Sequence, residues 1–215
     1  MYDLPHHKEK NEKLINEFID RYPFAFLSGC DADNNPVATQ VPVFIEEQDG
    51  KKILRGHIMK NTDHHKAFVH NPNVLAVFTG NHIYVSGTWY DNPYQPSTWN
   101  YMSVHAKGIM RFLDDSALVS VLRKTSLHFE NNNEHSTTYF DNLPQEYMQK
   151  LMKAIVAFEI EVTEMKNVFK LSQDRDEKSY HNIIEKLKDK GEDGCVIAAE
   201  MEKRTKDVFP DKGES

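Results

Sequence analysis

The segment Arg55–Asp63 combines basic side chains with residue types that begin helices. A strand runs into a helix start here, and Asn61, Thr62 and Asp63 are the candidate N-cap residues. Backbone N–H groups at such a start, with basic side chains nearby, form a candidate anchor for a phosphate group. Asp63 opposes this interpretation because its carboxylate repels the same anion. Basic residues near a helix start are also commonly just solvated, so both interpretations stay open.

Six aromatic residues, including both tryptophans of the chain, lie between His82 and Tyr101. They are Tyr84, Trp89, Tyr90, Tyr94, Trp99 and Tyr101. Hydroxyl and amide groups stand beside them, and flat apolar faces next to hydrogen-bonding edges suit a planar heteroaromatic ligand. The same composition also fits a loop that aromatic side chains pin to the rest of the domain.

Other kinds of reactive site have little support in the sequence. His57, His64, His65 and His70 form a loose cluster, but their spacing matches no zinc-binding pattern, so no metal site is predicted. The absence of a Gly-x-Ser-x-Gly motif disfavours a serine hydrolase. Histidines such as His57 and His105 titrate near neutral pH, which suits proton transfer. Structural histidines are commoner, however, and the catalytic residues stay unknown.

The elements that must position these residues are short strands with small helices between them. The predicted strands are 24–27, 37–45, 51–58, 74–78, 82–86, 99–112 and 154–162, and the predicted helices are 6–22, 62–71, 115–129 and 145–153. Asp49-Gly50 predicts a hairpin, and Thr79-Gly80-Asn81 is expected to join two separate strands. Short strands at this spacing predict a closed or partly closed antiparallel barrel.

Composition limits the class of protein. Of the 215 residues, 39% are hydrophobic and 27% are charged, which excludes a disordered or fibrous chain. The net charge of −7 lacks the basic excess that phosphate backbones require, so direct nucleic-acid binding is disfavoured. No membrane segment or signal peptide is predicted, and the distant Cys30 and Cys195 fit a reducing compartment. We therefore expect a cytoplasmic protein.

Four motifs, in this order, resemble those of the FMN-binding negative transcriptional regulators, the PaiB-like proteins. They are Gly56-His57…Asn61, Tyr84-Val85-Ser86-x-x-Trp89-Tyr90, Thr98-Trp99-Asn100-Tyr101-x-x-Val104-His105 and Lys170-Leu171-Ser172-Gln173-x-Arg175. The resemblance extends over about residues 1–200, and its Trp-Asn-Tyr and Leu-Ser-Gln blocks are the most specific. That family belongs to the FMN-binding split barrels, relatives of pyridoxamine-phosphate oxidases and flavin reductases. The resemblance implies a mainly β fold with peripheral helices (α+β), a six-stranded antiparallel split β-barrel, and a homodimer with FMN between its subunits.

The resemblance also implies which residues form the FMN site. Those expected near the phosphate and ribityl chain are Gly56, His57, Met59, Lys60, Asn61 and Thr62. Those expected to line the flavin or substrate side are Ser86, Trp89, Thr98, Trp99 and Asn100. Those expected to reach the pocket, from the same chain or its partner, are Lys170, Ser172, Gln173 and Arg175. The chain departs from the family pattern at Thr62-Asp63-His64, where Pro-x-Trp is common, and at Asp174, where Asn is usual.

The leading hypothesis is a dimeric FMN-binding flavoprotein with a redox or regulatory role, formed by one domain of residues 1–215. Residues 176–215, of which 19 of 40 are charged, are expected to form a charged C-terminal helical extension. Whether the protein is an enzyme stays open. The alternatives are a cofactor-free regulatory or interaction protein, a pyridoxamine-phosphate-oxidase-like or flavin-reductase-like oxidoreductase, and a barrel that holds haem in place of flavin.

Overall fold

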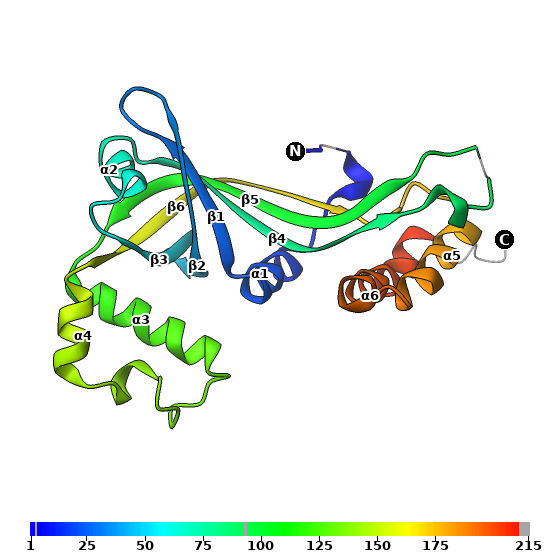
Figure 1. The fold of residues 1–215 in the computed structure, drawn as a ribbon. Coiled ribbons are helices and arrows are strands. Elements are labelled where there is room, and N and C mark those ends of the chain that lie inside the picture. Colours follow the sequence, from blue (N-terminus) through cyan, green and yellow to red (C-terminus); the bar gives the residue numbers. More distant parts are fainter. Residues whose placement is uncertain (3, 93, 211–215) are drawn as a thin grey trace. The chain divides into compact units, whose positions relative to one another are not determined.

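The computed structural model describes residues 1–2, 4–92 and 94–210. Within these residues six strands close into a barrel in the order β1-β2-β3-β6-β5-β4 (Figure 1). The strands are β1 (Phe24–Cys30), β2 (Pro36–Gln48), β3 (Lys51–Met59), β4 (Asn73–Val85), β5 (Thr98–Phe112) and β6 (Ile155–Lys170). The predicted six-stranded antiparallel barrel with peripheral helices is confirmed.

The helices lie between and after the strands. They are α1 (Glu12–Arg21), α2 (Asp63–His70), α3 (Asp115–Phe129), α4 (Gln145–Met152), α5 (Glu177–Lys188) and α6 (Gly191–Val208), with 3-10 turns η1 (Pro5–His7), η2 (Gly87–Trp89) and η3 (Phe140–Asn142). The N-cap side chains of Thr62, Asp114 and Asp176 each accept a bond from a backbone N–H in the first turn of their helix. No helix in the described part of the chain is long and apolar enough to cross a bilayer.

The hairpin predicted at Asp49-Gly50 is confirmed. Gln48 pairs with Lys51, and the two residues between them have φ of 53° and 73°. Two successive positive φ values are typical of the type I′ turn, whose twist matches the flanking strands.

Two predicted boundaries were wrong. β4 is continuous through Thr79-Gly80-Asn81, and neither Gly80 nor Asn81 has the positive φ of a type I′ or II′ hairpin turn. The helix predicted over 6–22 is interrupted, because the backbone of Lys8 is extended after η1. The helix α1 begins only at Glu12, where the Asn11 side chain accepts the Lys13 N–H at 3.0 Å.

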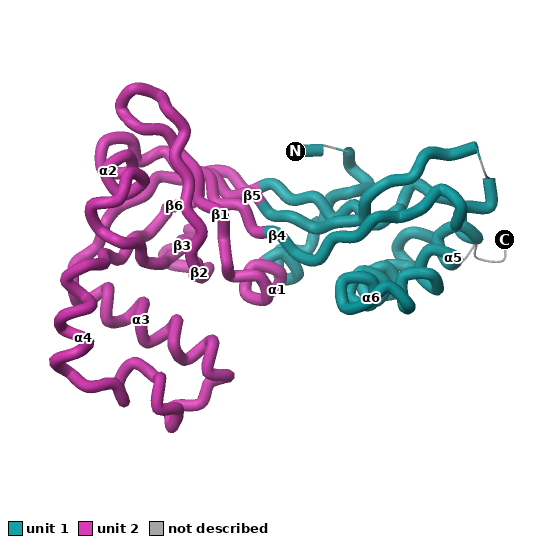
Figure 2. The backbone as a smooth tube through the Cα atoms, viewed as in Figure 1, with its two compact units in different colours: residues 1–15, 79–104, 166–215 teal, residues 16–78, 105–165 magenta. Residues whose placement is uncertain are grey.

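Contacts divide the chain into two compact units (Figure 2). Unit 2 comprises residues 16–78 and 105–165, and it contains the pairings of β1 with β2 and β4 and of β3 with β2 and β6. Its fully buried side chains include Leu27, Leu54 and Phe158. Strand β3 carries Gly56, His57 and Met59 of the predicted site in this unit.

Unit 1 comprises residues 1–15, 79–104 and 166–215. In it α5 and α6 lie side by side, and Tyr180, Ile183, Leu187 and Met201 are buried (Figure 1). The strands β4, β5 and β6 continue from one unit into the other, so the prediction of a single domain stays a prediction.

Candidate functional site

The residues predicted near a phosphate meet in unit 2, where β3 ends and α2 begins. Thr62 is the N-cap of α2, and its Oγ1 accepts the His65 N–H at 3.3 Å and donates to the Met59 carbonyl at 3.1 Å. Asn61 turns the chain with a φ of 66° and donates its N–H to His65 Nδ1. The structure thus brings Met59, Lys60, Asn61 and Thr62 into one tight turn, which we call the α2 turn.

Charge at the α2 turn is mixed. Burial, together with the positive charges of His64, Lys60 and Lys66, lowers the pKa of His65. Asp63 accepts the His64 N–H at 2.8 Å and lies 3.0 Å from His64 Nδ1, and these bonds lower the pKa of Asp63. An anion at this helix start would therefore be attracted by nearby cations, but it would compete with the Asp63 carboxylate for the His64 N–H.

Gly56 lies within the sheet, directly opposite Phe158 on β6. A Cβ at Gly56 would come within 2.8 Å of the Phe158 ring and 2.8 Å of the Pro42 carbonyl oxygen. The close approach of the Phe158 ring therefore requires glycine here for packing, and a role toward a phosphate stays a prediction.

His57 lies on the sheet face that α3 covers. It pairs with Ala157, and directly opposite residues share a face of the sheet. Ala157 packs with Leu118 and Val121 of α3. Burial lowers the pKa of His57, and its Nδ1 has no hydrogen-bond partner among the described residues. Burial therefore favours the neutral form of His57 beneath α3.

Exposed aromatic rings gather on β4 and β5 in unit 1. Trp99 is 51% exposed and Tyr84 is 48% exposed, and their ring centroids lie 6.1 Å apart. The His82 ring lies 5.9 Å from Trp99, and His82 and Tyr84 share a face because they are two residues apart on one strand. We call these three residues the aromatic cluster. It offers flat apolar faces to a planar ligand, with an imidazole at its edge.

Trp89 is not part of the aromatic cluster. It ends η2, whose N-cap is Ser86, and the Ser86 Oγ accepts the Thr88 N–H at 3.2 Å. The Lys190 ammonium lies 5.9 Å from the Trp89 ring centroid, a cation–π arrangement. Ser86 and Trp89 thus serve this turn and its contact with the helical end of the chain.

Asn100 and Ser172 bond to each other in the interior of unit 1. Ser172 Oγ donates to Asn100 Oδ1 at 2.9 Å, and Asn100 Nδ2 donates to Met201 Sδ at 3.5 Å. Asn100 is 0% exposed and Ser172 is 1% exposed. The two most specific motifs of the sequence therefore meet inside the protein, and a ligand could reach these side chains only by opening that contact.

Lys170 and Gln173 fix the chain at the end of β6. Lys170 donates to the Thr98 hydroxyl, which joins the predicted Thr98 and Lys170 directly. Gln173 Oε1 accepts the Leu171 N–H at 2.8 Å, and its amide donates to the Phe169 carbonyl. Gln173 thus closes the turn in which Ser172 stands with a φ of 60°.

Arg175 has two partners that the sequence did not identify as site residues. Its guanidinium lies 4.7 Å from the Tyr90 ring centroid and donates to Gln95 Oε1. Tyr84 and Tyr90 were among the six aromatic residues considered for a planar ligand, but not among the site residues that the resemblance implied. His82 was not considered, although its alternation with Tyr84 along a predicted strand was a signal that both face the same side.

No group of three or more metal-binding side chains occurs among residues 1–2, 4–92 and 94–210. The loose histidine cluster is used for local contacts. His64 contacts Asp63, and the His65 ring lies 4.9 Å from Phe112. These histidines therefore stabilise the start of α2.

A family model described as "Putative FMN-binding domain" matches residues 1–164. The chain belongs to this FMN-binding family. It is also similar to Protease synthase and sporulation protein PAI 2 of Bacillus subtilis (strain 168), with 29% identity over 201 residues, 94% of this chain and 96% of the relative. The resemblance to the PaiB-like proteins is thereby confirmed.

Two solved structures share the fold. The FAD and haem binding protein of Mycobacterium smegmatis has a TM-score of 0.54 and 15% identity, covering 75% of this chain and 72% of its own. The conserved hypothetical protein Rv2991 of Mycobacterium tuberculosis has a TM-score of 0.55 and 13% identity, covering 79% of this chain and 91% of its own. At these identities the likeness shows the fold alone.

Each unit, taken by itself, has residues that suit one part of a flavin nucleotide. In unit 2, Lys60 of the α2 turn and Lys66 of α2 offer positive charge to a phosphate, and in unit 1 the aromatic cluster has exposed faces for a planar ring. The buried Asn100 and Ser172 do not offer a free polar atom to a ligand, because each is bonded within the chain. The donor set therefore fits FMN in part, and a role of Asn100 and Ser172 toward a flavin stays a prediction.

Proposed function

We propose that this protein binds FMN and functions as a cytoplasmic homodimer in flavin-dependent redox chemistry or in regulation. The observation that carries the proposal is the aromatic cluster, where Trp99 and Tyr84 leave about half of their surfaces exposed in contact with one another. An isoalloxazine ring is a planar heteroaromatic group that stacks on such faces. Membership of the FMN-binding family supports this choice, and the family resemblance supports the dimer.

The chain's own residues have separate tasks in this proposal. Within unit 1, Trp99 packs against the ring. Within unit 2, Thr62 orders the α2 turn, and Lys60 and the nearby Lys66 offer positive charge to a phosphate. FMN supplies the electron transfer when bound, while the protein supplies binding, orientation and the electrostatic environment.

A second candidate is a regulatory protein that holds no cofactor. The Asp63 carboxylate favours it, because it already accepts the backbone N–H that a phosphate would use at the start of α2. With a net charge of −7, regulation through a metabolite or a protein partner fits better than direct contact with DNA. A gel-shift titration over a range of salt concentrations tests that point, and tight, salt-sensitive DNA binding would refute it.

The first experiment is an absorbance spectrum of the purified protein before and after incubation with FMN and desalting. Flavin bands at about one FMN per chain support the proposal. A colourless protein that retains no FMN contradicts it and favours the regulatory candidate. A Soret band shows haem instead of flavin.

Variants then locate the flavin. Trp99→Ala should weaken FMN binding by about tenfold or more, because it removes a stacking face. Tyr94→Ala is the matched control, since Tyr94 is 93% exposed and lies outside the aromatic cluster. Asp63→Asn should tighten FMN binding while leaving riboflavin binding unchanged, since riboflavin has no phosphate. Equal effects on the two flavins would remove Asp63 from the phosphate site.

A further inference from the structure

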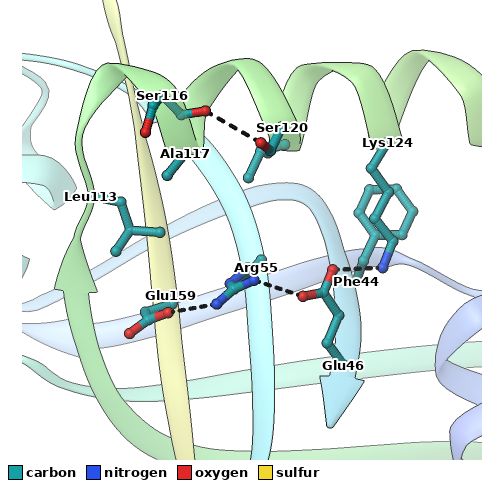
Figure 3. A pocket seen from close by; sticks show the side chains of 10 residues that line it. Phe44, Glu46, Arg55, Leu113, Ser116, Ala117, Ser120, Lys124 and Glu159 are labelled. Carbon is teal, nitrogen blue, oxygen red and sulfur yellow. Dashed lines mark hydrogen bonds and ion pairs between the residues drawn. The ribbon is translucent and has the colours of Figure 1, made fainter. Parts of the chain in front are cut away.

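A hollow of about 280 Å³ lies in unit 2 between the sheet and α3 (Figure 3). Phe44, Arg55 and Glu159 form its floor, because Arg55 pairs with Phe44 on β2 and with Glu159 on β6, and all three share one face. Ala117 and Lys124 of α3 line the other side. The volume is close to the lower end for small-molecule pockets.

The charges that line this hollow are balanced and form a chain of ion pairs. Arg55 donates to Glu46 at 2.8 Å and to Glu159 at 3.2 Å, so its guanidinium lies between two carboxylates (Figure 3). Lys124 donates to the other oxygen of Glu46 at 2.9 Å. Glu159 also accepts from Arg111, which lies outside the lining, at 3.2 Å. Among the lining residues themselves two cations face two anions, and apolar surface from Phe44 and Ala117 adjoins them.

Two buried polar atoms on this face have no hydrogen-bond partner among the described residues. They are Arg55 Nε and His57 Nδ1, which stand two residues apart on β3 and so on the same face. Val121 lines the hollow and also packs with Ala157, the residue opposite His57. Buried polar atoms without partners are rare in native proteins and indicate a missing polar neighbour.

We propose that this hollow binds a small zwitterion of the α-amino acid class, independently of any flavin. An ion of one sign would add an unbalanced charge to a lining whose own charges cancel. A zwitterion keeps the balance, because its carboxylate pairs with the Lys124 ammonium and its ammonium pairs with a carboxylate of the same row, Glu46 or Glu159. One bond of the Lys124 ammonium to Glu46 leaves it capacity for further acceptors, and the ligand's apolar side chain lies against Phe44 and Ala117.

The test uses the full chain and three probes with nearly the same apolar body: L-leucine, 4-methylpentanoate and isopentylamine. Titration calorimetry, with and without FMN, should show saturable binding of L-leucine. The carboxylate-only and amine-only probes should bind at least about tenfold more weakly. Equal binding of all three, or no binding of L-leucine, would overturn the proposal and leave a hollow that holds water.

Two variants locate the binding. Ala117→Leu fills the hollow with a good helix former, and Lys124→Met removes the ammonium while Arg55 stays paired with Glu46. Both should weaken L-leucine binding by at least about tenfold. Arg123→Met is the matched control, because this neighbouring cation on α3 pairs with Asp141 instead, and it should bind L-leucine as the unmodified chain does. Unchanged binding in Ala117→Leu and Lys124→Met would place the ligand elsewhere and refute the site.

Discussion

The bond between Asn100 and Ser172 gives the sharpest test of what the family motifs do in this chain. Both side chains are buried, and Ser172 Oγ donates to Asn100 Oδ1 at 2.9 Å. If this bond stabilises the fold, its two partners should be energetically coupled. If Asn100 instead serves a flavin, its loss should affect FMN binding more than stability. The perturbation is therefore the pair of substitutions Asn100→Ala and Ser172→Ala, made singly and together.

The magnitudes follow from burial. A hydrogen bond contributes about 1 kcal/mol net, and a buried polar group left without its partner costs about 1–3 kcal/mol. Asn100→Ala should lower the free energy of unfolding by about 2–3 kcal/mol, because it leaves the Ser172 hydroxyl without an acceptor. Ser172→Ala should cost about 1–3 kcal/mol and keeps a Cβ at the same φ of 60°. The double variant leaves neither group stranded, so its loss should fall short of the sum by about 1–2 kcal/mol.

Urea denaturation at neutral pH measures these free energies, and FMN retention is measured on the same samples under folding conditions. Asn92→Ala is the control, because Asn92 is exposed in the same unit and should change stability by less than about 0.5 kcal/mol. Additive losses in the double variant would refute the coupling. An Asn100→Ala protein of unchanged stability that loses FMN would instead assign Asn100 to the ligand.

Two further predictions concern β3. Gly56→Ala should destabilise the protein by about 1–3 kcal/mol, because the new Cβ would lie 2.8 Å from both the Phe158 ring and the Pro42 carbonyl oxygen; an unchanged melting temperature would contradict this. Because burial lowers the pKa of His57, the unfolded chain binds its proton first, and the free energy of unfolding should fall as the pH drops below about 6.5, by at most about 1.4 kcal/mol per pH unit. Urea titrations from about pH 8 to about pH 5 should show a shallower decline in His57→Gln, and parallel curves would show that His57 is not the cause.

The fold was largely predictable where local signals agree with the final packing. The helix predicted over 115–129 matches α3, which the side chain of Asp114 caps. The hairpin at Asp49-Gly50 was predictable because the residue types that favour this turn all lie within the four residues that form it. Gly80 led to a wrong prediction of a turn, because glycine favours a turn only where the backbone takes a positive φ. Here Gly80 lies within the long strand β4 and has no positive φ. The interruption before α1 depends on the bond of Asn11 to Lys13, which periodicity does not show.

The site was less predictable, because residue type does not reveal which way a side chain faces. The α2 turn and the exposed Trp99 were identified from composition and the family resemblance. That His57 lies beneath α3 follows from its register with Ala157, which needs the sheet pairing. The Arg175 contact with Tyr90 joins segments 85 residues apart, and no local pattern encodes it.

Residues of one family-specific motif do not all face a possible ligand. The Trp-Asn-Tyr block contains an exposed ring, Trp99, next to a fully buried amide, Asn100. Alternation along β5 requires this, because consecutive residues of a strand face opposite sides. The amide can hold the strand to the turn at Ser172 while the neighbouring ring stays open to a ligand. The same short motif therefore places a buried packing residue next to an exposed ring. A substitution at Asn100 would then affect a flavin bound on Trp99 through the strand that carries both residues.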